Sequence, residues 1–504
     1  MDEDKAFKVL IEPVLSVLGI TVNEHNVMER IIAFSKNIKT EISNDLKGIL
    51  FSLKMDVATR LDLSMLGINV QYIKHGKIVV KTLAIKELRS SHTSEYLKTV
   101  ILDVLKEYDV DIRNILTITT DNGSNMLKTV RILNCEMQLS INNDAVDFEE
   151  DEDDIDCRIA IDTIESIDFN ISSNTITSIR CGAHTLQLCV NDVLKQSAVK
   201  DNVDKIRFVV KKLSSKSELY KKPIIDCATR WYSTYKMIER CLEMKEIINT
   251  LSKDYPDLFL ESEEWSFATE FLGLFKPIYN ATIKLQSEQL CYSELYIIVM
   301  DITFQIDVLP DSNMKTLLKE SLKIRKDKLL ENELFNAAVF LDPRIKVCLT
   351  CEQKQRAKNY ILSLYKRMNS TEEHNTSHPI LEEAPSPSRP DAAKSFSDYL
   401  QIIDPTTEIP SSSNLHNLEA DFANYERQSR LPLNENIIAF WNSQKTIISE
   451  IANIVQAIPS TQVSVERLFS AMKYILSDQR NRMSATNLEH ILMVKVNGDF
   501  NYES

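Results

Sequence analysis

Glycine is scarce in this sequence, with only eight glycines among 504 residues. None stands in a Gly-x-x-x-x-Gly-Lys pattern or in a Gly-x-Gly-x-x-Gly turn after a strand, the two arrangements that cradle nucleotide phosphates. We therefore expect no nucleotide cofactor. Long apolar runs are also missing, since none reaches the roughly 18 residues that a membrane-spanning helix needs. The first residues lack the basic stretch that opens a signal peptide, so we expect neither secretion nor a membrane partner.

Cysteine is sparse, with nine residues scattered along the chain and none before Cys135. This number is too low for a disulfide scaffold and fits a reducing compartment. Cys181 and His184 have the spacing of half a zinc site, but no second pair follows at the distance typical of a zinc finger. Because Cys348 and Cys351 lie far away in an apparently helical stretch, we expect no zinc site.

Basic residues are outnumbered, 59 to 73, which gives a net charge of -14. Such a balance argues at first against nucleic acid, because phosphate binding needs a basic surface. However, nine of the thirteen residues from Asp144 to Asp156 are acidic, and the rest of the chain carries only about -5. We interpret residues 143–156 as an acidic, solvated loop, so a local DNA-binding face is not excluded.

Strand and helix patterns divide the chain. Residues 1–47 have helical spacing, and from residue 48 three strands are expected in succession, with a turn at His75 and Gly76 between the last two. A helix capped by Thr93 or Ser94, a strand that ends at Asp121 and another helix should follow. This order is how an RNase H-like sheet begins, although other α/β folds start in the same way.

The second half of the chain has mainly helical periodicity. A strand is expected near residues 176–181, followed by a helical region from 191 to 367. Residues 368–415 are rich in serine, proline and acid, and we interpret them as a disordered linker. Helical periodicity returns in residues 416–504.

Two aspartates end strands that could be neighbours. If the strand that ends at Asp121 pairs with the one that ends near Asp56, right-handed crossover packing brings both carboxylates to one sheet edge. Paired carboxylates suit Mg²⁺, and two such ions can activate a nucleophile and stabilise the leaving oxygen of a phosphodiester. Taken alone, each aspartate is more often a turn former or a helix cap.

A series of motifs resembles the hAT (hobo/Activator) transposase superfamily. The C-terminal stretch IPSTQVSVERLFSAMKYILSDQRNRMSATNLEHILMVKVN is similar to the segment usually called the dimerisation region of that family. Five further matches occur in family order: SLKMDVATR, ITTDNGSNM, RCGAHTLQLCVNDVL, ATRWYSTYKM and FLDPRIK. Together they cover residues 51–497, and their shared order makes the resemblance specific.

The resemblance implies an α/β fold plus an all-α part: an RNase H-like catalytic domain interrupted by an all-helical insertion, with a C-terminal helical dimerisation segment. The core would comprise residues 48–190 and be completed within 416–504, with the insertion at 191–367. It also implies a metal-binding catalytic triad of Asp56, Asp121 and Glu466 that uses Mg²⁺ or Mn²⁺, DNA as a partner, self-association and a nuclear location. Without the family match, Glu466 would be read as an ordinary solvated helix residue.

Three further residues match family positions near the cleaved DNA strand. The resemblance gives His184 a role close to DNA, whereas a hydrogen-bonded core histidine is an equal alternative. It also implies that Arg230 holds phosphate and that Trp231 stacks on an unpaired base. Plain core packing of the tryptophan is a serious competitor.

A basic run provides the best candidate for a phosphate-binding face. Residues 205–222 contain seven basic residues and one acid, and we assign the DNA contact to Lys205, Arg207, Lys211 and Lys212. Basic runs on helices are more often simply solvated.

Two departures from the family leave two hypotheses open. Many relatives begin with a BED zinc finger, which residues 1–134 cannot form without cysteine, and many carry tryptophan after the first aspartate, where this chain has Val57. The first hypothesis is a transposase that cleaves DNA and transfers strands. The second is a domesticated, non-mobilising nuclear protein that keeps the fold for DNA-associated regulation or dimerisation. The triad favours the first, and the missing finger favours the second.

Overall fold

The structure is a computed structural model that describes most of the chain. The described residues are 24–60, 63–90, 92–121, 123–142, 175–215, 221–227, 230–373, 414–476 and 483–498. The expected acidic loop at 143–156 lies outside them, as does residue range 1–23 of the expected helical lead-in. The expected linker at 368–415 lies mostly outside them too, but its first residues belong to a helix, α14, that continues to Glu373.

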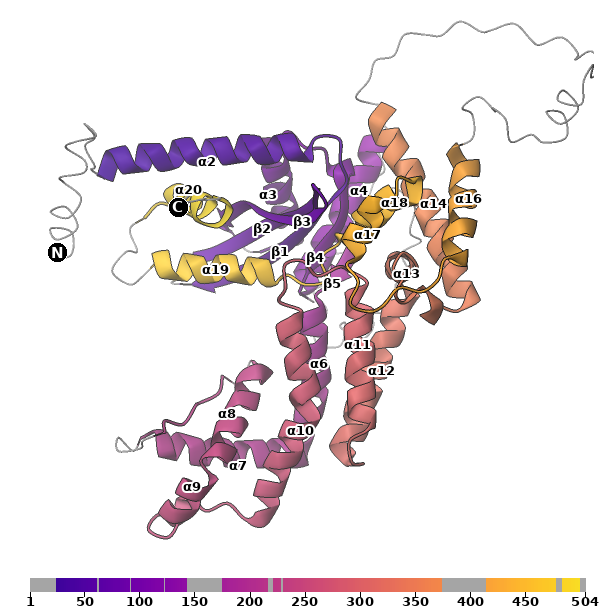
Figure 1. Ribbon diagram of the computed structural model, residues 1–504. Helices are drawn as coiled ribbons and strands as arrows, with labels where there is room; N and C mark the ends of the chain where they lie inside the picture. Colours follow the sequence, from indigo (N-terminus) through magenta and orange to yellow (C-terminus); the bar gives the residue numbers. More distant parts are fainter. Residues whose placement is uncertain are drawn as a thin grey trace, which may run out of the picture.

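A mixed five-stranded sheet forms the α/β part of the fold (Figure 1). Its strands are β1 (Phe51–Arg60), β2 (Leu63–Lys74), β3 (Lys77–Glu87), β4 (Ile115–Thr120) and β5 (Thr177–Arg180). The strand order is β3-β2-β1-β4-β5, with β1 to β3 antiparallel and β4 and β5 parallel to β1. This mixed sheet is consistent with the expected RNase H-like core.

The β2–β3 hairpin turns at His75 and Gly76, which both have positive φ angles, 49° and 71°. Such angles match the twist of a two-residue hairpin, and an asparagine, glycine or similar residue adopts them most readily. Within β1, side chains alternate between the two sheet faces, so Leu53 and Met55 enter an apolar core while Lys54 and Asp56 face the other way.

The apolar sheet face is covered by three helices. They are α2 (Glu24–Leu46), α3 (Ser94–Glu107) and α4 (Ser124–Asn142), and they share one hydrophobic core with the strands. Thr93 caps α3 by accepting a hydrogen bond from the Tyr96 backbone N–H at 3.3 Å, as its sequence position predicted.

The opposite sheet face carries buried polar side chains, together with Met65 and Ile85, which join an apolar cluster with the C-terminal helices. Residues 457–462 and helix α19 (Val463–Ile475) lie across it and accept or donate hydrogen bonds to its side chains. Gln71 donates to the Ala457 carbonyl at 2.6 Å, and Thr119 donates to the Pro459 carbonyl at 2.9 Å. The C-terminal segment therefore satisfies polar groups that would otherwise be costly to bury.

Side-chain amides from two distant segments bind the backbone of the edge strand β3. Asn497, the last residue of α20 (Ala485–Asn497), accepts from the Thr82 N–H and donates to the Thr82 carbonyl, each at 2.8 Å. Gln289 makes the same pair of bonds to Ile78, at 3.3 and 2.8 Å. Each amide thus takes the place of a neighbouring strand at one residue.

Of the remaining described helices, some lie beside the sheet and others lie far from it (Figure 1). These remaining helices are α6 (Gly182–Leu194), α7 (Ser197–Ser214), α8 (Trp231–Glu243), α9 (Lys245–Leu251), α10 (Ser262–Lys284), α11 (Glu294–Asp307), α12 (Asn313–Glu331), α13 (Glu333–Phe340), α14 (Cys351–Glu373), α16 (Asn414–Arg427), α17 (Ile437–Ser443) and α18 (Ile447–Gln456). In the described part of the chain, no helix has the length and apolar character needed to cross a membrane.

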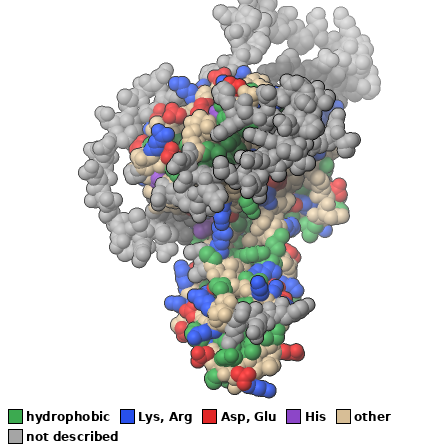
Figure 2. Space-filling model, turned by 90° about the vertical axis from the view of Figure 1, so that its left-hand side faces the viewer, with side chains coloured by type: hydrophobic (Ala, Val, Ile, Leu, Met, Phe, Trp, Pro, Cys, Tyr) green, Lys and Arg blue, Asp and Glu red, His purple; other side chains and the backbone are tan. Residues whose placement is uncertain are grey.

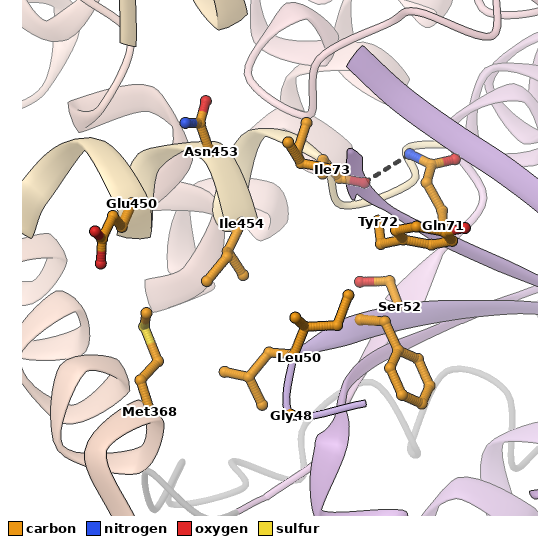
Figure 3. Close-up of a pocket in the computed structure, with 13 residues that line it drawn as sticks. Gly48, Leu50, Ser52, Gln71, Tyr72, Ile73, Met368, Glu450, Asn453 and Ile454 are labelled. Carbon is orange, nitrogen blue, oxygen red and sulfur yellow. Dashed lines mark hydrogen bonds between the residues drawn. The ribbon is translucent and has the colours of Figure 1, made fainter. Parts of the chain in front are cut away.

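A cavity of about 290 Å³ lies where β1 begins, between the sheet, α14 and α18 (Figure 3). Leu50, Ile454 and Met368 line it with apolar groups, and Asn453 and Glu450 lie at its rim. The cavity lies at the start of β1, whereas Asp56 lies farther along the strand, so the cavity is not lined by the expected catalytic carboxylates.

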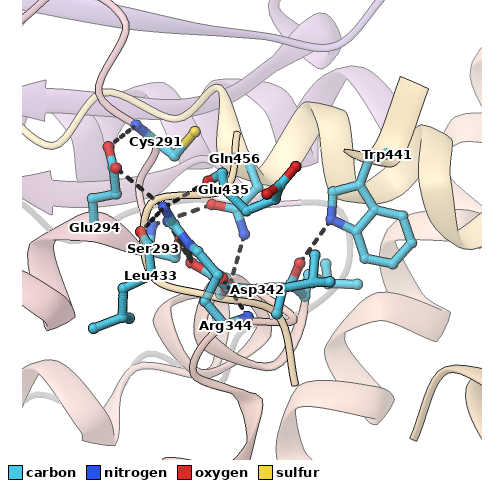
Figure 4. A network of polar contacts seen from close by, with 12 residues as sticks. Cys291, Ser293, Glu294, Asp342, Arg344, Leu433, Glu435, Trp441 and Gln456 are labelled. Atoms are coloured by element: carbon cyan, nitrogen blue, oxygen red, sulfur yellow. Dashed lines mark hydrogen bonds and ion pairs between the residues drawn. The ribbon is translucent and has the colours of Figure 1, made fainter. Parts of the chain in front are cut away.

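The FLDPRIK motif forms a buried network of polar contacts between segments that are far apart in sequence (Figure 4). Asp342 is fully buried and binds the Arg344 guanidinium at 2.8 Å and the Ser293 hydroxyl at 2.7 Å. The same guanidinium donates to the carbonyls of Leu433 and Glu435, at 3.3 and 3.2 Å. This motif, which matched the family, therefore joins the helical part to the C-terminal segment.

Replacing Arg344 should destabilise the fold strongly. Arg344→Ala leaves the Asp342 carboxylate buried without its cation, which typically costs about 3–5 kcal/mol of unfolding free energy. Urea denaturation followed by circular dichroism measures this change. Arg356→Ala is the control, because Arg356 makes an exposed i,i+4 pair with Glu352 whose loss costs about 0.5 kcal/mol or less. Equal midpoints for the two variants would contradict the assignment.

Candidate active site

Asp56 and Asp121 occupy equivalent register positions on the neighbouring parallel strands β1 and β4. Asp121 directly follows β4, but the prediction that Asp56 ends its strand was wrong, because β1 stays paired with β2 as far as Arg60. The register pairs Lys54 of β1 with Thr119 of β4, and each aspartate follows two residues later. Neighbouring strands are about 4.8 Å apart, so the two aspartates leave the sheet side by side. The register also pairs Asp56 with Gly67 on the other neighbour, β2. The crossover inferred from the sequence is the arrangement that the structure has.

Glu466 comes to the same edge on α19, which packs on β1 and β2. Val465 and Leu468 are buried beneath the helix, while the Glu466 side chain remains exposed. Asn69 of β2 donates a hydrogen bond to the Ser464 hydroxyl at 2.9 Å, which fixes the first turn of α19 on the sheet.

Charge crowding links the three carboxyl groups. The pKa of Asp56 is raised to about 7, mainly by burial and then by the charge of Asp121, with a smaller contribution from Glu466; a hydrogen bond from the Val57 N–H opposes the rise. Partial exclusion of water also raises the pKa of Glu466, against the opposing charge of Arg230. The structure therefore brings the predicted triad into one electrostatic neighbourhood, with Arg230 beside it.

The carboxylates of the predicted triad offer oxygen atoms of the kind that Mg²⁺ prefers as ligands. Among the described residues, neither Asp56, Asp121 nor Glu466 takes part in an ion pair. Across the same residues, no three histidine, cysteine, aspartate or glutamate side chains lie close enough to hold a metal ion. Mg²⁺ usually takes one or two carboxylates and completes its shell with water and substrate phosphate. The acids fit such an open site and do not form a closed ligand set.

His184 lies near Asp121, in the first turn of α6. The helix begins beside the acids because β5 is parallel to β4 and the Cys181 N–H donates to the Thr120 carbonyl at 3.1 Å. Burial lowers the pKa of His184, and the charge of Asp121 opposes this shift. A half-buried imidazole at this edge is compatible with both interpretations of the residue, contact with DNA or a structural role.

Arg230 and Trp231, adjacent in sequence, have different environments. Arg230 is exposed at the start of α8, and its charge partly opposes the rise in the pKa of Glu466. Trp231 is only 4% exposed and packs against Tyr235 and Phe275, with ring centroids 6.4 Å away in both cases. The structure places the indole in the core, so stacking on a base would require it to leave this packing.

Acidic neighbours neutralise much of the basic run. Lys205 binds Glu264 at 2.5 Å, and Arg207 binds the buried carboxylate of Asp226 at 2.7 Å. Lys212 lies 3.7 Å from Asp257, and Lys211 is exposed. Figure 2 shows basic side chains on the helical part as separate patches among acidic and apolar ones. Lys205 and Arg207 thus have structural partners, and a DNA contact by the run stays a prediction.

Two residues that position the site were missed in the sequence. Gly67 faces α19 from β2, and a glycine inside a strand pattern is a known signal of close backbone approach. Arg467 binds Glu288 at 2.6 Å and the Gln286 carbonyl at 2.8 Å, which ties α19 to the segment after α10. No sequence signal indicates that second contact, because it joins residues about 180 positions apart.

Known protein families match two separate parts of the chain. The ZBED1 RNase-like helical domain matches residues 179–272. The hAT family C-terminal dimerisation region matches residues 421–497, which include α19 and Glu466. The latter match indicates self-association.

Relatives with similar sequences agree with these matches. The chain is 22% identical to "Putative transcriptional regulator tpeD" of Talaromyces stipitatus, over 84% of this chain and 50% of that protein. It is 24% identical to human "Zinc finger BED domain-containing protein 4", over 66% of this chain and 30% of the relative. It is 22% identical to "Putative AC transposase" of Zea mays, over 66% of this chain and 46% of that protein. The chain thus spans half or less of each relative, and together these matches support the resemblance of the chain to the hAT superfamily.

Proposed function

We propose that this protein is a hAT-type DNA transposase that cleaves DNA and transfers strands with Asp56, Asp121 and Glu466 as its catalytic residues. The observation that carries the proposal is that Asp121, at the end of β4, and Glu466, on α19, both raise the pKa of Asp56 on β1, while none of the three carboxylates has an ion-pair partner in the described residues. Charge crowding of this kind disfavours the metal-free protein and favours binding of a divalent cation.

The proposed architecture is an RNase H-like core, built on the five-stranded sheet and interrupted by the helices from α7 to α14. Support comes from the strand order and from the return of the chain across the polar sheet face at residues 457–475. A nuclear location and a homodimer or higher oligomer belong to the same proposal, on the strength of the relatives and of the dimerisation region.

The chain's own groups would have distinct tasks in the reaction. Asp56 and Asp121 would hold Mg²⁺ or Mn²⁺, which supplies an activated nucleophile and neutralises the leaving oxygen of the phosphodiester. Glu466 would complete the negative site from the opposite side. Arg230, exposed beside Glu466, would bind a non-bridging oxygen of the phosphate with its guanidinium. His184 would donate or accept a hydrogen bond through its imidazole ring.

A second candidate function is DNA-associated regulation without cleavage. One relative is named as a transcriptional regulator, and Val57 follows the first aspartate where many relatives have tryptophan. A domesticated protein of this kind would keep DNA binding and dimerisation and lose chemistry.

Cleavage of DNA tests the proposal directly. Purified protein should nick a duplex end or form a hairpin on it in Mg²⁺ or Mn²⁺, whereas Ca²⁺ should support binding only, because its ligand geometry differs. Asp56→Ala, Asp121→Ala and Glu466→Gln should each lower the rate by at least about 100-fold. Glu270→Gln, at an exposed helix position, is the control and should cut normally.

Two results would count against this function. Cleavage that survives all three substitutions would refute the site, since the carboxylates would not be needed. Metal-independent DNA binding by the wild-type chain, without any cleavage in Mn²⁺, would favour the regulatory alternative.

Stability of the metal-free protein should fall as pH rises. Because the pKa of Asp56 is raised to about 7 in the fold, the native state holds a proton that the unfolded chain releases near pH 4. The stabilising effect of protonation is complete below about pH 4 and is lost as pH rises to about 7. Asp56→Asn should therefore unfold with a free energy about 1–3 kcal/mol higher than wild type at pH 8, in EDTA.

Urea denaturation at pH 4 and pH 8 measures this difference, which should vanish at the lower pH. Mg²⁺ at 100 times its dissociation constant should stabilise the wild type by about 2.7 kcal/mol and the variant less. Asp103→Asn, at an exposed position in α3, is the control. If Asp56→Asn and the wild type had the same unfolding free energy at both pH values, the pKa of Asp56 would not be raised in the fold.

A further inference from the structure

We infer that Gly67 is a positioning residue for the third carboxylate: its missing side chain lets α19 approach β2 closely enough to bring Glu466 beside Asp56. This inference rests on the function proposed above. Gly67 lies directly opposite Asp56 in the β1–β2 register. At this position, the distance between β2 and α19 therefore also sets the distance between Asp56 and Glu466.

The contact at Gly67 leaves no room for a methyl group. A Cβ atom there would lie 2.7 Å from Cγ1 of Val465, 3.2 Å from the Phe469 ring and 3.3 Å from Leu468. The first distance is shorter than side-chain carbons tolerate, so one of the two elements would have to move. Val465 immediately precedes Glu466, and movement of its backbone would therefore move the carboxylate.

The backbone of Gly67 does not itself require glycine. Its φ lies outside the left-handed region in which other residues are strained, unlike that of Gly76. Alanine can adopt the same strand conformation, so the effect of a substitution would come from the contact with α19. This separates a positioning role from the usual reason for a glycine in a turn.

The helix cannot easily slide away to relieve the contact. Ser464 is bound by Asn69 at 2.9 Å on one side of Val465, and Arg467 is bound by Glu288 at 2.6 Å on the other. Val465 is fully buried, so it has little freedom to change its rotamer. The remaining response is a lift or tilt of the first turn of α19, which carries Glu466 away from the aspartates.

A small displacement is enough to matter for chemistry. Catalytic groups must be held within about 0.5 Å of their productive positions. A misplacement of about 1 Å can cost about 100-fold in rate. The sequence therefore encodes part of the active-site geometry in a residue that has no functional group.

Gly67→Ala should lower kcat for DNA cleavage by about 10- to 100-fold while leaving KM for the DNA unchanged. Gly67→Ala/Val465→Ala should recover most of the loss, because the second substitution removes the Cγ1 atom that the new methyl group meets. Gly273→Ala is the matched control, since a Cβ at Gly273 meets nothing within 4 Å. Circular dichroism and urea denaturation identify conditions in which every variant is folded.

Binding of Mn²⁺ to the protein without DNA, measured by electron paramagnetic resonance, gives a second readout. Glu466→Gln should weaken Mn²⁺ binding in the wild-type background and have little further effect in Gly67→Ala, because Glu466 is already displaced there. In the Gly67→Ala/Val465→Ala variant, Glu466→Gln should again weaken Mn²⁺ binding, as it does in the wild-type background. A merely destabilising substitution would not produce this pattern of loss and recovery.

The outcomes separate the inference from the proposed function. If Gly67→Ala cuts DNA and binds Mn²⁺ like wild type, or if Val465→Ala fails to rescue it, the inference is overturned. If the wild type does not cut DNA but its Mn²⁺ affinity follows the predicted pattern, the proposed function fails and the positioning role of Gly67 stands.

Discussion

The return of the chain across the polar face of the sheet, between Gln456 and Ser464, is the contact on which the rest of the structure depends. This stretch binds the sheet through Gln71, Thr119 and Asn69. It also binds the helical part, since the Ser460 carbonyl accepts from the Gly182 N–H at 2.7 Å and the Gln456 carbonyl accepts from Tyr292 at 3.1 Å. Three regions far apart in sequence thus share one buried strip of backbone, and Glu466 follows it directly.

The local elements of the fold could be predicted because they have local causes. Strand-like stretches and the turn at His75 and Gly76 predicted β1 to β3, Thr93 or Ser94 was the expected cap of α3, and the crossover rule placed Asp56 beside Asp121. The position of Glu466 could not be derived in this way, because its neighbours on β2 lie about 400 residues earlier and no local pattern records such a contact. Only the family resemblance supplied it.

Side-chain partners were the harder part to predict. A tryptophan at the start of a helix has the same sequence appearance whether it faces the core or a ligand, and burial of Trp231 is decided by Phe275, which lies on another helix. Likewise, a run of lysines and arginines reveals nothing about the acids that face it, and Glu264 and Asp226 come from outside the helix that carries Lys205 and Arg207. The start of the expected linker was wrong for a related reason, since Tyr360, Leu364 and neighbours pack into the core and keep α14 helical to Glu373.

The amides of Gln289 and Asn497 have a consequence for how copies of this chain can assemble. An exposed edge strand is a template for another strand, and proteins commonly block such edges. At Ile78 and Thr82 the backbone groups of β3 are already occupied by side chains. A second molecule therefore cannot extend the sheet through these residues without displacing both amides. The two amides therefore oppose sheet-to-sheet pairing at this edge, and the proposed self-association through the C-terminal region would not use β3 at Ile78 and Thr82.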